Sequence, residues 1–322
     1  MSFDPEAMAD RRRLRRKLSF WRALGVLGLI AAVVIAGLAA AGRPPFGPAR
    51  SQIARVSVDG FIAGSQRTSD LLRRVGESSA VSGVVISINS PGGSTTGAEE
   101  LFRGIRQLAA KKPLVAFVDG TAASGGYIAA LAADHIVARE TSLVGSVGVL
   151  FQYPDLSKLL DTVGVRVEEI KSAPLKAEPS PFHATSPEAR AALQQVVGDT
   201  FDWFKGLVAD RRKLNEADLG VIASGRVFNG RQALPLRLVD ELGGEREAIA
   251  WLEREKGVAK DLPVRQWRPR DDRSFNFWTA ASLGARLLGL EDVAGRLRQA
   301  LQAVDEAKPE GLLVLWRPSL EQ

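Results

Sequence analysis

The chain has 322 residues, of which 45% are hydrophobic and 25% charged, enough for one large globular domain or two small ones. It has no cysteine, which excludes disulfides, thiolate metal sites and cysteine nucleophiles, and its two histidines are too few for a histidine-rich metal centre. The formal net charge is +6, but seven Lys or Arg residues lie within 11–22, so we expect no broad basic face and no nucleic-acid partner.

Residues 23–42 form an uncharged apolar run that follows a basic N-terminus, residues 1–22. As a helix rising about 1.5 Å per residue, this run is long enough to span the hydrocarbon core of a bilayer. Basic flanks stay in the cytoplasm, so we expect a single-pass anchor, a linker at 43–52, and the rest of the chain outside the cytoplasm. A cleaved signal peptide is the alternative, although its apolar region usually has only roughly 7–15 residues.

Strand and helix patterns alternate from residue 53 onwards. Apolar, β-branched segments predict strands at 53–62, 81–89, 113–120, 135–140 and 165–171, and helical spacing predicts helices at 69–78, 95–112 and 124–133. Residues 186–218 are expected to form a long helix or a helix pair, and residues 221–258 to be helical with glycine-rich breaks. This alternation predicts an α/β domain, residues 53–260, with helices packed on a mostly parallel sheet.

The C-terminal extension, residues 261–322, is rich in Arg and Trp. Within it, residues 279–304 have the spacing of an amphipathic helix. We expect this helix to dock on the domain or on a partner, with a helix lying at the membrane surface as the alternative.

Two turns are expected at the carboxyl ends of neighbouring strands, NSPGGS at 89–94 and ASGG at 123–126. Such strand ends are where open α/β sheets bind ligands. Ser124 would begin a helix, so the N–H of Gly125 is a free donor beside its hydroxyl, and Gly93 lets a second backbone N–H approach. Two converging donors form an oxyanion hole, in which one donor contributes roughly 3–4 kcal/mol of transition-state stabilisation. A Ser-Gly-Gly turn alone is more often only a tight turn, because a nucleophile also needs a base.

A histidine is one candidate base. His135 begins the strand after the expected helix, which carries it away from Ser124, so we interpret it as a strand-end histidine with a local partner. His183 lies in a proline-rich loop and completes the chain order Ser124, Asp161, His183 of an α/β-hydrolase. The turn at Ser124 lacks the first glycine of that family's elbow, which weighs against this triad.

A lysine is the other candidate, and Lys171 and Lys176 both follow the expected strand at 165–171. A lysine that acts as a base near neutral pH needs a pKa lowered from about 10.4 to about 7. That shift requires burial away from carboxylates, whereas most lysines are solvated surface charges. The residues alone leave the choice between histidine and lysine open.

From Ile53 to Gly244 the chain resembles the signal peptide peptidase A family, membrane-anchored serine proteases with a Ser–Lys dyad. Five motifs in order carry the resemblance: INSPGGS (88–94), VDGTAASGGYIAALAADHIVA (118–138), TSLVGSVGV (141–149), IKSAPLK (170–176) and GRVFNGRQALPLRLVDELGG (225–244). The size and the single anchor resemble the short form of the family. The resemblance implies a fold shared with the Clp protease and crotonase groups, and no metal or organic cofactor.

The same resemblance implies roles for particular residues. Ser124 matches the nucleophile, Lys176 the general base, and Ser146 a serine that orients the lysine. Gly93 and Gly125 match the oxyanion-hole positions. One departure is that Ala173-Pro174 stand where the family usually has glycine, and proline restricts the path to Lys176.

The family further implies a setting and partners. The substrates would be hydrophobic peptides such as cleaved signal peptides, and the protein would be a homo-oligomer whose dyad can be completed across a subunit interface. The location would be the bacterial inner (plasma) membrane, with the N-terminus cytoplasmic and the catalytic domain periplasmic. One alternative is an inactive peptide-binding membrane scaffold. Another is an acyl-CoA enzyme of the crotonase class, but no carboxylate stands near Ser124 or Gly93 in the sequence.

Overall fold

The computed structural model describes residues 50–269 and 313–315, together with residues 17, 20–22, 24, 25 and 28. The chain divides into two units, Met1–Ser51 and Gln52–Gln322, and the elements described below belong to the second. Most of the expected anchor at 23–42 and all of the expected amphipathic stretch at 279–304 lie outside the described residues. Within the described residues, no helix combines the length and apolar character needed to cross a membrane.

The second unit alternates strands and helices as expected. Its strands are β1 (Gln52–Ile62), β2 (Val81–Ser94), β3 (Leu114–Ala123), β4 (Ile136–Ala138), β5 (Leu143–Gly145), β6 (Val227–Asn229), β7 (Glu241–Leu242), β8 (Val264–Trp267) and β9 (Leu313–Leu315). Its helices are α2 (Gln66–Glu77), α3 (Thr95–Ala109), α4 (Gly125–Leu131), α5 (Ser157–Val163), α6 (Pro187–Arg212), α7 (Glu216–Ile222), α8 (Gly230–Ala233) and α9 (Glu245–Lys256).

The strands form one mostly parallel sheet in the order β6-β5-β3-β2-β1-β8. All neighbours in this order pair in parallel except β5 and β6, and β9 pairs with the end of β2 in antiparallel fashion. Strand β4 runs parallel to β3 and β7. The expected mixed α/β fold with a mostly parallel sheet is confirmed. Strands β8 and β9 come from within the predicted C-terminal extension.

Three local expectations were wrong. Residues 90–94, expected as a turn, belong to β2, because β1 and β9 pair with this segment from its two sides. Residues 165–171, expected as a strand, form no strand and pair with none of the described strands, and their apolar side chains are exposed. Residues 221–258 contain the short strands β6 and β7 between helices, because these segments find partners in β5 and β4.

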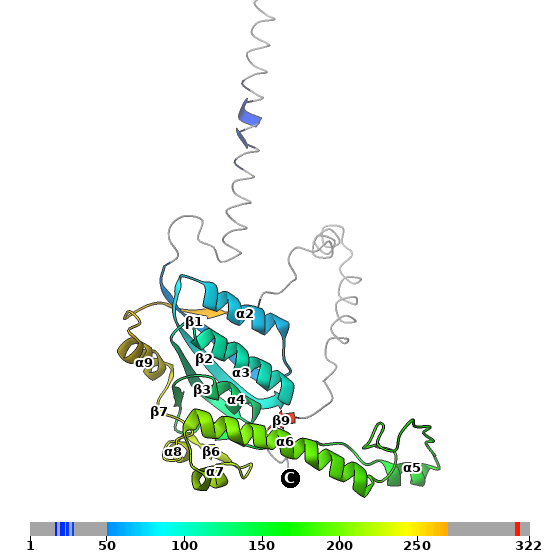
Figure 1. Ribbon diagram of the computed structural model, residues 1–322. Coiled ribbons are helices and arrows are strands. Elements are labelled where there is room, and N and C mark those ends of the chain that lie inside the picture. The colour runs from blue at the N-terminus through cyan, green and yellow to red at the C-terminus, as the bar shows by residue number, and fades with distance from the viewer. Residues whose placement is uncertain are drawn as a thin grey trace, which may run out of the picture. The chain divides into compact units, whose positions relative to one another are not determined.

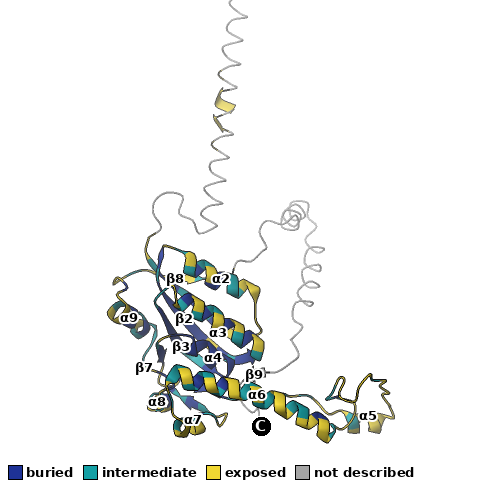
Figure 2. Cartoon of the chain, in the orientation of Figure 1, coloured by how far each residue is buried: buried dark blue, intermediate teal, exposed yellow. Residues whose placement is uncertain are grey.

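The core lies on both faces of the sheet, which explains why the central strands are almost continuously apolar. Along β2, Val84, Ile86 and Ile88 pack with the helices α2, α3, α4 and α6, whereas Val85 faces the opposite side. On that side Val85 meets Trp251 and its neighbours on α9. Figure 2 shows the central strands buried between these two helical layers.

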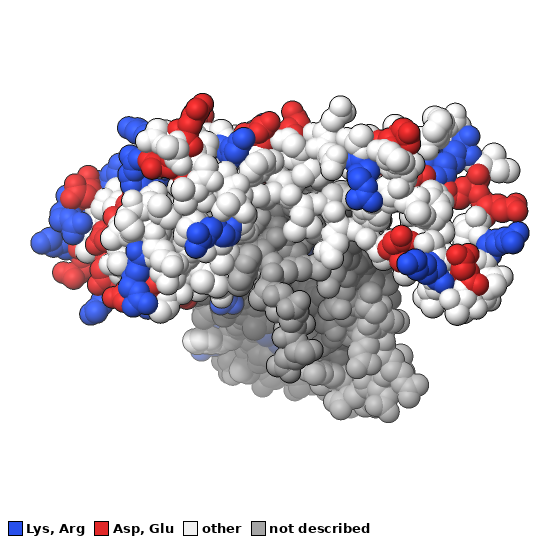
Figure 3. Space-filling view, turned by 90° about the horizontal axis from the view of Figure 1, so that it is seen from below, with Lys and Arg blue, Asp and Glu red and all other residues white. Residues whose placement is uncertain are grey.

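One part of the chain lies outside this layered body. Residues 151–186, most of the segment between β5 and α6, are called the arm here; they include α5, a helix with no buried residue. Figure 1 shows α5 beyond the far end of α6, away from the sheet. On the face shown in Figure 3, acidic and basic side chains are interspersed at the two ends, with uncharged side chains between them.

Candidate active site

Ser124 lies in the turn that joins β3 to α4, with φ 54° and ψ −116°. This positive φ is uncommon for a residue with a side chain, and such strain gathers at functional sites. The backbone is fixed on both sides: the Ser124 N–H donates to the Gly145 carbonyl at 2.8 Å, and the Ser124 carbonyl accepts from Tyr127 and Ile128. The side chain is 1% exposed and does not cap the helix that follows. The backbone that carries the hydroxyl is thus fixed, and the hydroxyl itself is not used to build the turn.

The two segments that the sequence predicted as turns, 89–94 and 123–126, lie at the carboxyl ends of the neighbouring strands β2 and β3. Ser90 of β2 is the register partner of Ala122 of β3, two residues before Ser124. A Cβ added to Gly126 would lie 2.5 Å from the Ser90 carbonyl oxygen, so the first turn of α4 packs directly on β2. Glycine at position 126 is therefore required by this close approach.

Ser90 is a residue that sequence reasoning missed. It is fully buried, and its hydroxyl donates to the Gly60 carbonyl at 2.6 Å while accepting from the Gly92 N–H at 3.1 Å. These bonds hold the backbone at Gly92, which has φ 113°, just before Gly93. The signal in the sequence is a serine two residues before a glycine, the spacing of a side-chain-to-backbone turn.

Gly93 stands beside β1 with no room for a side chain, since an added Cβ would lie 1.9 Å from the Ile62 carbonyl oxygen. We expect Gly93→Ala to lower the free energy of unfolding by about 1–3 kcal/mol and to displace the backbone of β2, because overpacking forces such shifts. Thermal unfolding and peptide turnover measure the two effects. The matched control is Gly198→Ala on α6, where an added Cβ meets nothing within 4 Å. Equal stability of the two variants would contradict this account of Gly93.

The edge of β2 at Gly92–Ser94 is paired with β9, in which Val314 is the partner of Gly93. The pairing is antiparallel and takes the side of β2 from which β3 has diverged after Ser90. This edge next to Ser124 therefore accepts an extended peptide segment.

Ser146 follows β5, whose last residue Gly145 is the register partner of Ala123. It is 8% exposed with φ 50°, and its N–H donates to the Arg226 carbonyl at 2.9 Å. Ser124 and Ser146 thus lie at the ends of adjacent strands, each in a strained backbone conformation. The serine predicted to orient a lysine stands next to the predicted nucleophile.

Lys176 belongs to the arm, and its side chain has no hydrogen bond to either serine. Its side chain is exposed and takes part in no hydrogen bond or ion pair with the described residues, and its N–H donates to the Ala173 carbonyl at 3.0 Å. Lys171 differs, because its ammonium lies 2.6 Å from a Glu169 oxygen and 2.7 Å from a Glu178 oxygen. Hydrogen bonds from Lys171 to Glu169 and Glu178 raise the pKa of Lys171, which keeps this lysine charged and unsuited to accept a proton.

The histidines are engaged elsewhere. His135 stacks on Trp251 with ring centroids 4.5 Å apart, and its Nε2 lies 3.2 Å from Glu241, which confirms the interpretation of a strand-end histidine with local partners. His183 contacts Glu169 and Glu178, not Asp161. The described residues therefore show no hydrolase-type pairing of Asp161 with His183.

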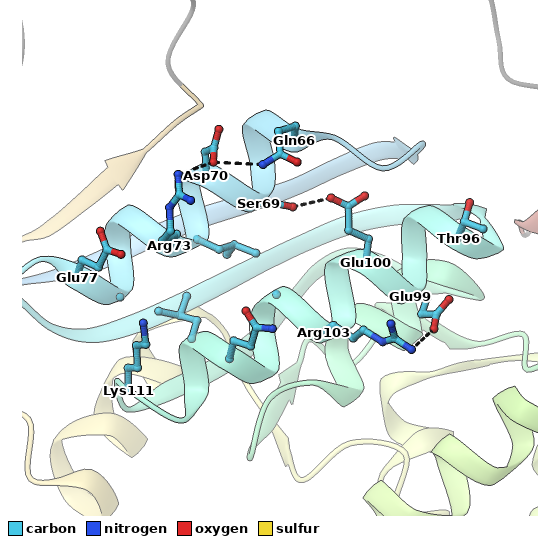
Figure 4. Close-up of a pocket in the computed structure, with 15 residues that line it drawn as sticks. Gln66, Ser69, Asp70, Arg73, Glu77, Thr96, Glu99, Glu100, Arg103 and Lys111 are labelled. Carbon is cyan, nitrogen blue, oxygen red and sulfur yellow. Dashed lines mark hydrogen bonds and ion pairs between the residues drawn. The ribbon is translucent and has the colours of Figure 1, made fainter.

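A polar groove of about 460 Å³ runs between α2 and α3 (Figure 4). Its side chains pair with one another: Ser69 donates to Glu100 at 2.6 Å, and Arg103 binds Glu99 on the same helix. The groove is lined by none of the predicted site residues. The charged side chains of its walls are complementary to one another and not to an apolar peptide.

Several known proteins are similar to this chain over most of its sequence. The family model described as peptidase family S49 matches residues 106–259. A protein from Methanocaldococcus jannaschii named as a protease is 33% identical over 71% of this chain and 75% of its own length. One from Synechocystis, also named as a protease, is 36% identical over 66% of this chain and 77% of its own. A protein from Enterococcus faecium named as a signal peptide peptidase SppA is 32% identical over 69% of this chain and 68% of its own length. Together with the layout of the Ser124 turn, these matches show that the chain belongs to peptidase family S49 and is a serine protease of the signal peptide peptidase A family.

Proposed function

We propose that this protein is a membrane-anchored endopeptidase whose Ser–Lys dyad degrades hydrophobic peptides such as cleaved signal peptides. The observation that carries the proposal is the Ser124 turn, in which a buried serine with a strained backbone follows β3, the strand paired with β2 at Ser90 just before Gly92 and Gly93. Lys176 is the base, and the N–H groups of Gly93 and Gly125 form the oxyanion hole. The family membership supports the reaction, and the free side chain of Lys176 supports the choice of this lysine over Lys171.

The proposed reaction has two steps. Neutral Lys176 takes the hydroxyl proton of Ser124 while the Ser124 oxygen bonds to the carbonyl carbon of the peptide. The N–H groups of Gly93 and Gly125 stabilise the negative charge that forms on the carbonyl oxygen. The C–N bond then breaks, Lys176 returns its proton to the leaving amine, and an acyl-enzyme remains. Water next gives a proton to Lys176 and attacks the ester carbon. The ester C–O bond then breaks, Lys176 passes that proton to the Ser124 oxygen, and the carboxylic acid is released.

We further propose that Lys176 serves the Ser124 of a neighbouring subunit. Ser124 is buried in the layered body, whereas Lys176 is carried by the arm, which Figure 1 shows extending away from the sheet. The arm exposes many large apolar side chains, among them Leu159, Val163, Val165, Ile170 and Leu175. Because exposed apolar side chains are stabilised when a partner removes them from water, this surface of the arm favours binding to another protein. A second copy that covers the arm would also remove Lys176 from water, which disfavours the charged form of a lysine.

The substrate would bind as an extended strand along the Gly92–Ser94 edge. Strand β9 supports this mode, because it pairs with the same edge and consists of the apolar sequence Leu-Val-Leu. A substrate strand that uses this edge takes the place of β9. Main-chain pairing of this kind gives affinity without a fixed sequence, which suits degradation of many peptides.

The proposed anchor is residues 23–42, with the catalytic domain outside the cytoplasm, at the inner membrane of a bacterium. The support is the uncharged length of this run and the basic residues before it. Such an anchor would hold the protease where cleaved signal peptides remain in the bilayer.

The test is hydrolysis by the full chain in detergent of two fluorogenic peptides of equal length, one Ala- and Leu-rich and one with alternating Asp and Lys. We expect turnover of the apolar peptide, with kcat/KM at least about tenfold above that for the charged peptide. Binding of the apolar peptide without cleavage, measured by fluorescence anisotropy, would contradict the proposal and favour an inactive scaffold.

A further inference from the structure

A compact ionic cluster lies in the arm on both sides of Lys176. The ammonium of Lys171 lies 2.6 Å from Glu169 Oε2 and 2.7 Å from Glu178 Oε1. The Nε2 of His183 lies 3.4 Å from the same two oxygen atoms. These four residues, Glu169, Lys171, Glu178 and His183, are called the arm cluster below.

The arm cluster closes the base of the loop that carries Lys176. Glu169 and Lys171 precede Lys176 in the chain, and Glu178 and His183 follow it. Ser180 adds two further links, since its hydroxyl donates to Glu169 at 3.0 Å and its N–H donates to Glu178 at 3.3 Å. The segments that precede and follow Lys176 are therefore linked to each other through their side chains.

Among the described residues, no apolar core holds this loop in place. Helix α5 has no buried residue, and Val165, Val167 and Leu175 are exposed. By contrast, the side chains of Lys171 and Glu178 are only 18% and 9% exposed. The hydrogen bonds from Lys171 also lower the pKa of Glu169 and of Glu178, so all three groups stay charged at neutral pH. Polar contacts thus take the place of packing in fixing the loop.

The arm cluster is also the one group of acidic and histidine side chains, among the described residues, whose ligand atoms are close enough for a metal ion. The two carboxylate oxygens that such an ion would use already bind the ammonium of Lys171. A cation of the chain itself occupies that place, which favours a structural role over metal binding.

We propose that the arm cluster, with Lys171 at its centre, is a positioning device that sets the place of the base Lys176. The inference rests on the proposed function of Lys176. Lys171 acts through the backbone of its loop and touches no substrate. Two lysines five residues apart thereby have separate tasks, one bound between carboxylates and one left free for proton transfer.

The test compares Lys171→Met with Lys158→Met in the full-length protein. Lys158 is an exposed lysine of the same arm that makes no side-chain hydrogen bond or ion pair with the described residues. We expect Lys171→Met to lower kcat by about 10²-fold, because small misplacement of a catalytic group has effects of this size. Its KM should stay within twofold of wild type, since the substrate binds at β2, and Lys158→Met should behave as wild type. Lys171→Arg, which keeps the charge and the donors, should restore most of kcat.

The outcomes separate this inference from the proposed function. Wild-type kcat in Lys171→Met, with Lys176→Met inactive, would overturn the positioning role and leave the dyad standing. An active Lys176→Met beside an inactive Lys171→Met would overturn both, because Lys171 itself would be the base. Should Lys171→Met fail to fold or assemble, Glu169→Gln decides, since it keeps the bond from Lys171 to Glu178 and should lower kcat by about tenfold. Full kcat in an intact Glu169→Gln protein would overturn the inference.

Discussion

Ser124→Ala is expected to lower the turnover of an apolar peptide by at least about 10³-fold, because removal of a covalent nucleophile leaves only binding and the oxyanion hole. The fold should be unaffected. The side chain is 1% exposed, and the hydroxyl makes no hydrogen bond with the described residues, so alanine fills the same space and leaves no partner unpaired. Steady-state hydrolysis and circular dichroism of the same preparation measure the two effects.

The matched control for this change is Ser224→Ala. Ser224 is exposed, its hydroxyl donates to the Val221 carbonyl at 2.9 Å, and it lies just before the last of the five motifs and outside it. It should retain wild-type turnover. If Ser124→Ala retained more than a tenth of wild-type activity, Ser124 would not be the nucleophile, and the strained turn would be only a structural feature.

Lys176→Met is expected to lower turnover by a similar factor of at least about 10³, since an alcohol is a weak nucleophile without a base. The fold should again be retained, because the side chain is exposed and has no hydrogen bond or ion pair with the described residues. Turnover and the sedimentation coefficient of each variant measure activity and assembly. Lys158→Met is the control for loss of an arm lysine. Wild-type turnover in Lys176→Met would remove this residue from the reaction.

The sheet and the turn at Ser124 could be predicted from the sequence because their signals are local. Continuous β-branched runs marked buried strands, and the glycines of 89–94 marked a close backbone approach, which the structure has between Gly93 and Ile62 of β1. The strand expected at 165–171 failed for the opposite reason. A strand forms only where a partner exists, and Val165 and Val167 pair with none of the described strands.

Contacts between segments far apart in the chain could not be predicted from the sequence. Nothing in the apolar run Leu313–Leu315 indicated that it would pair with Gly92–Ser94, more than two hundred residues earlier. Similarly, Lys171 and Lys176 look alike in the sequence, and only the folded arm shows which of them binds Glu169 and Glu178. The residue types alone could not indicate that Lys171 is held by two carboxylates while the side chain of Lys176 is exposed.

The most direct test of the central claim is to mix two inactive variants, Ser124→Ala and Lys176→Met, within one assembly. Co-expression at equal levels lets subunits of both kinds assemble together, and turnover of the apolar peptide is compared with each variant alone. If Lys176 serves the Ser124 of a neighbouring subunit, random mixing should restore about one quarter of wild-type turnover, because half of the sites keep the serine and half of their neighbours keep the lysine. If mixed assemblies form and remain as inactive as the single variants, the dyad is not shared between subunits and the account is wrong.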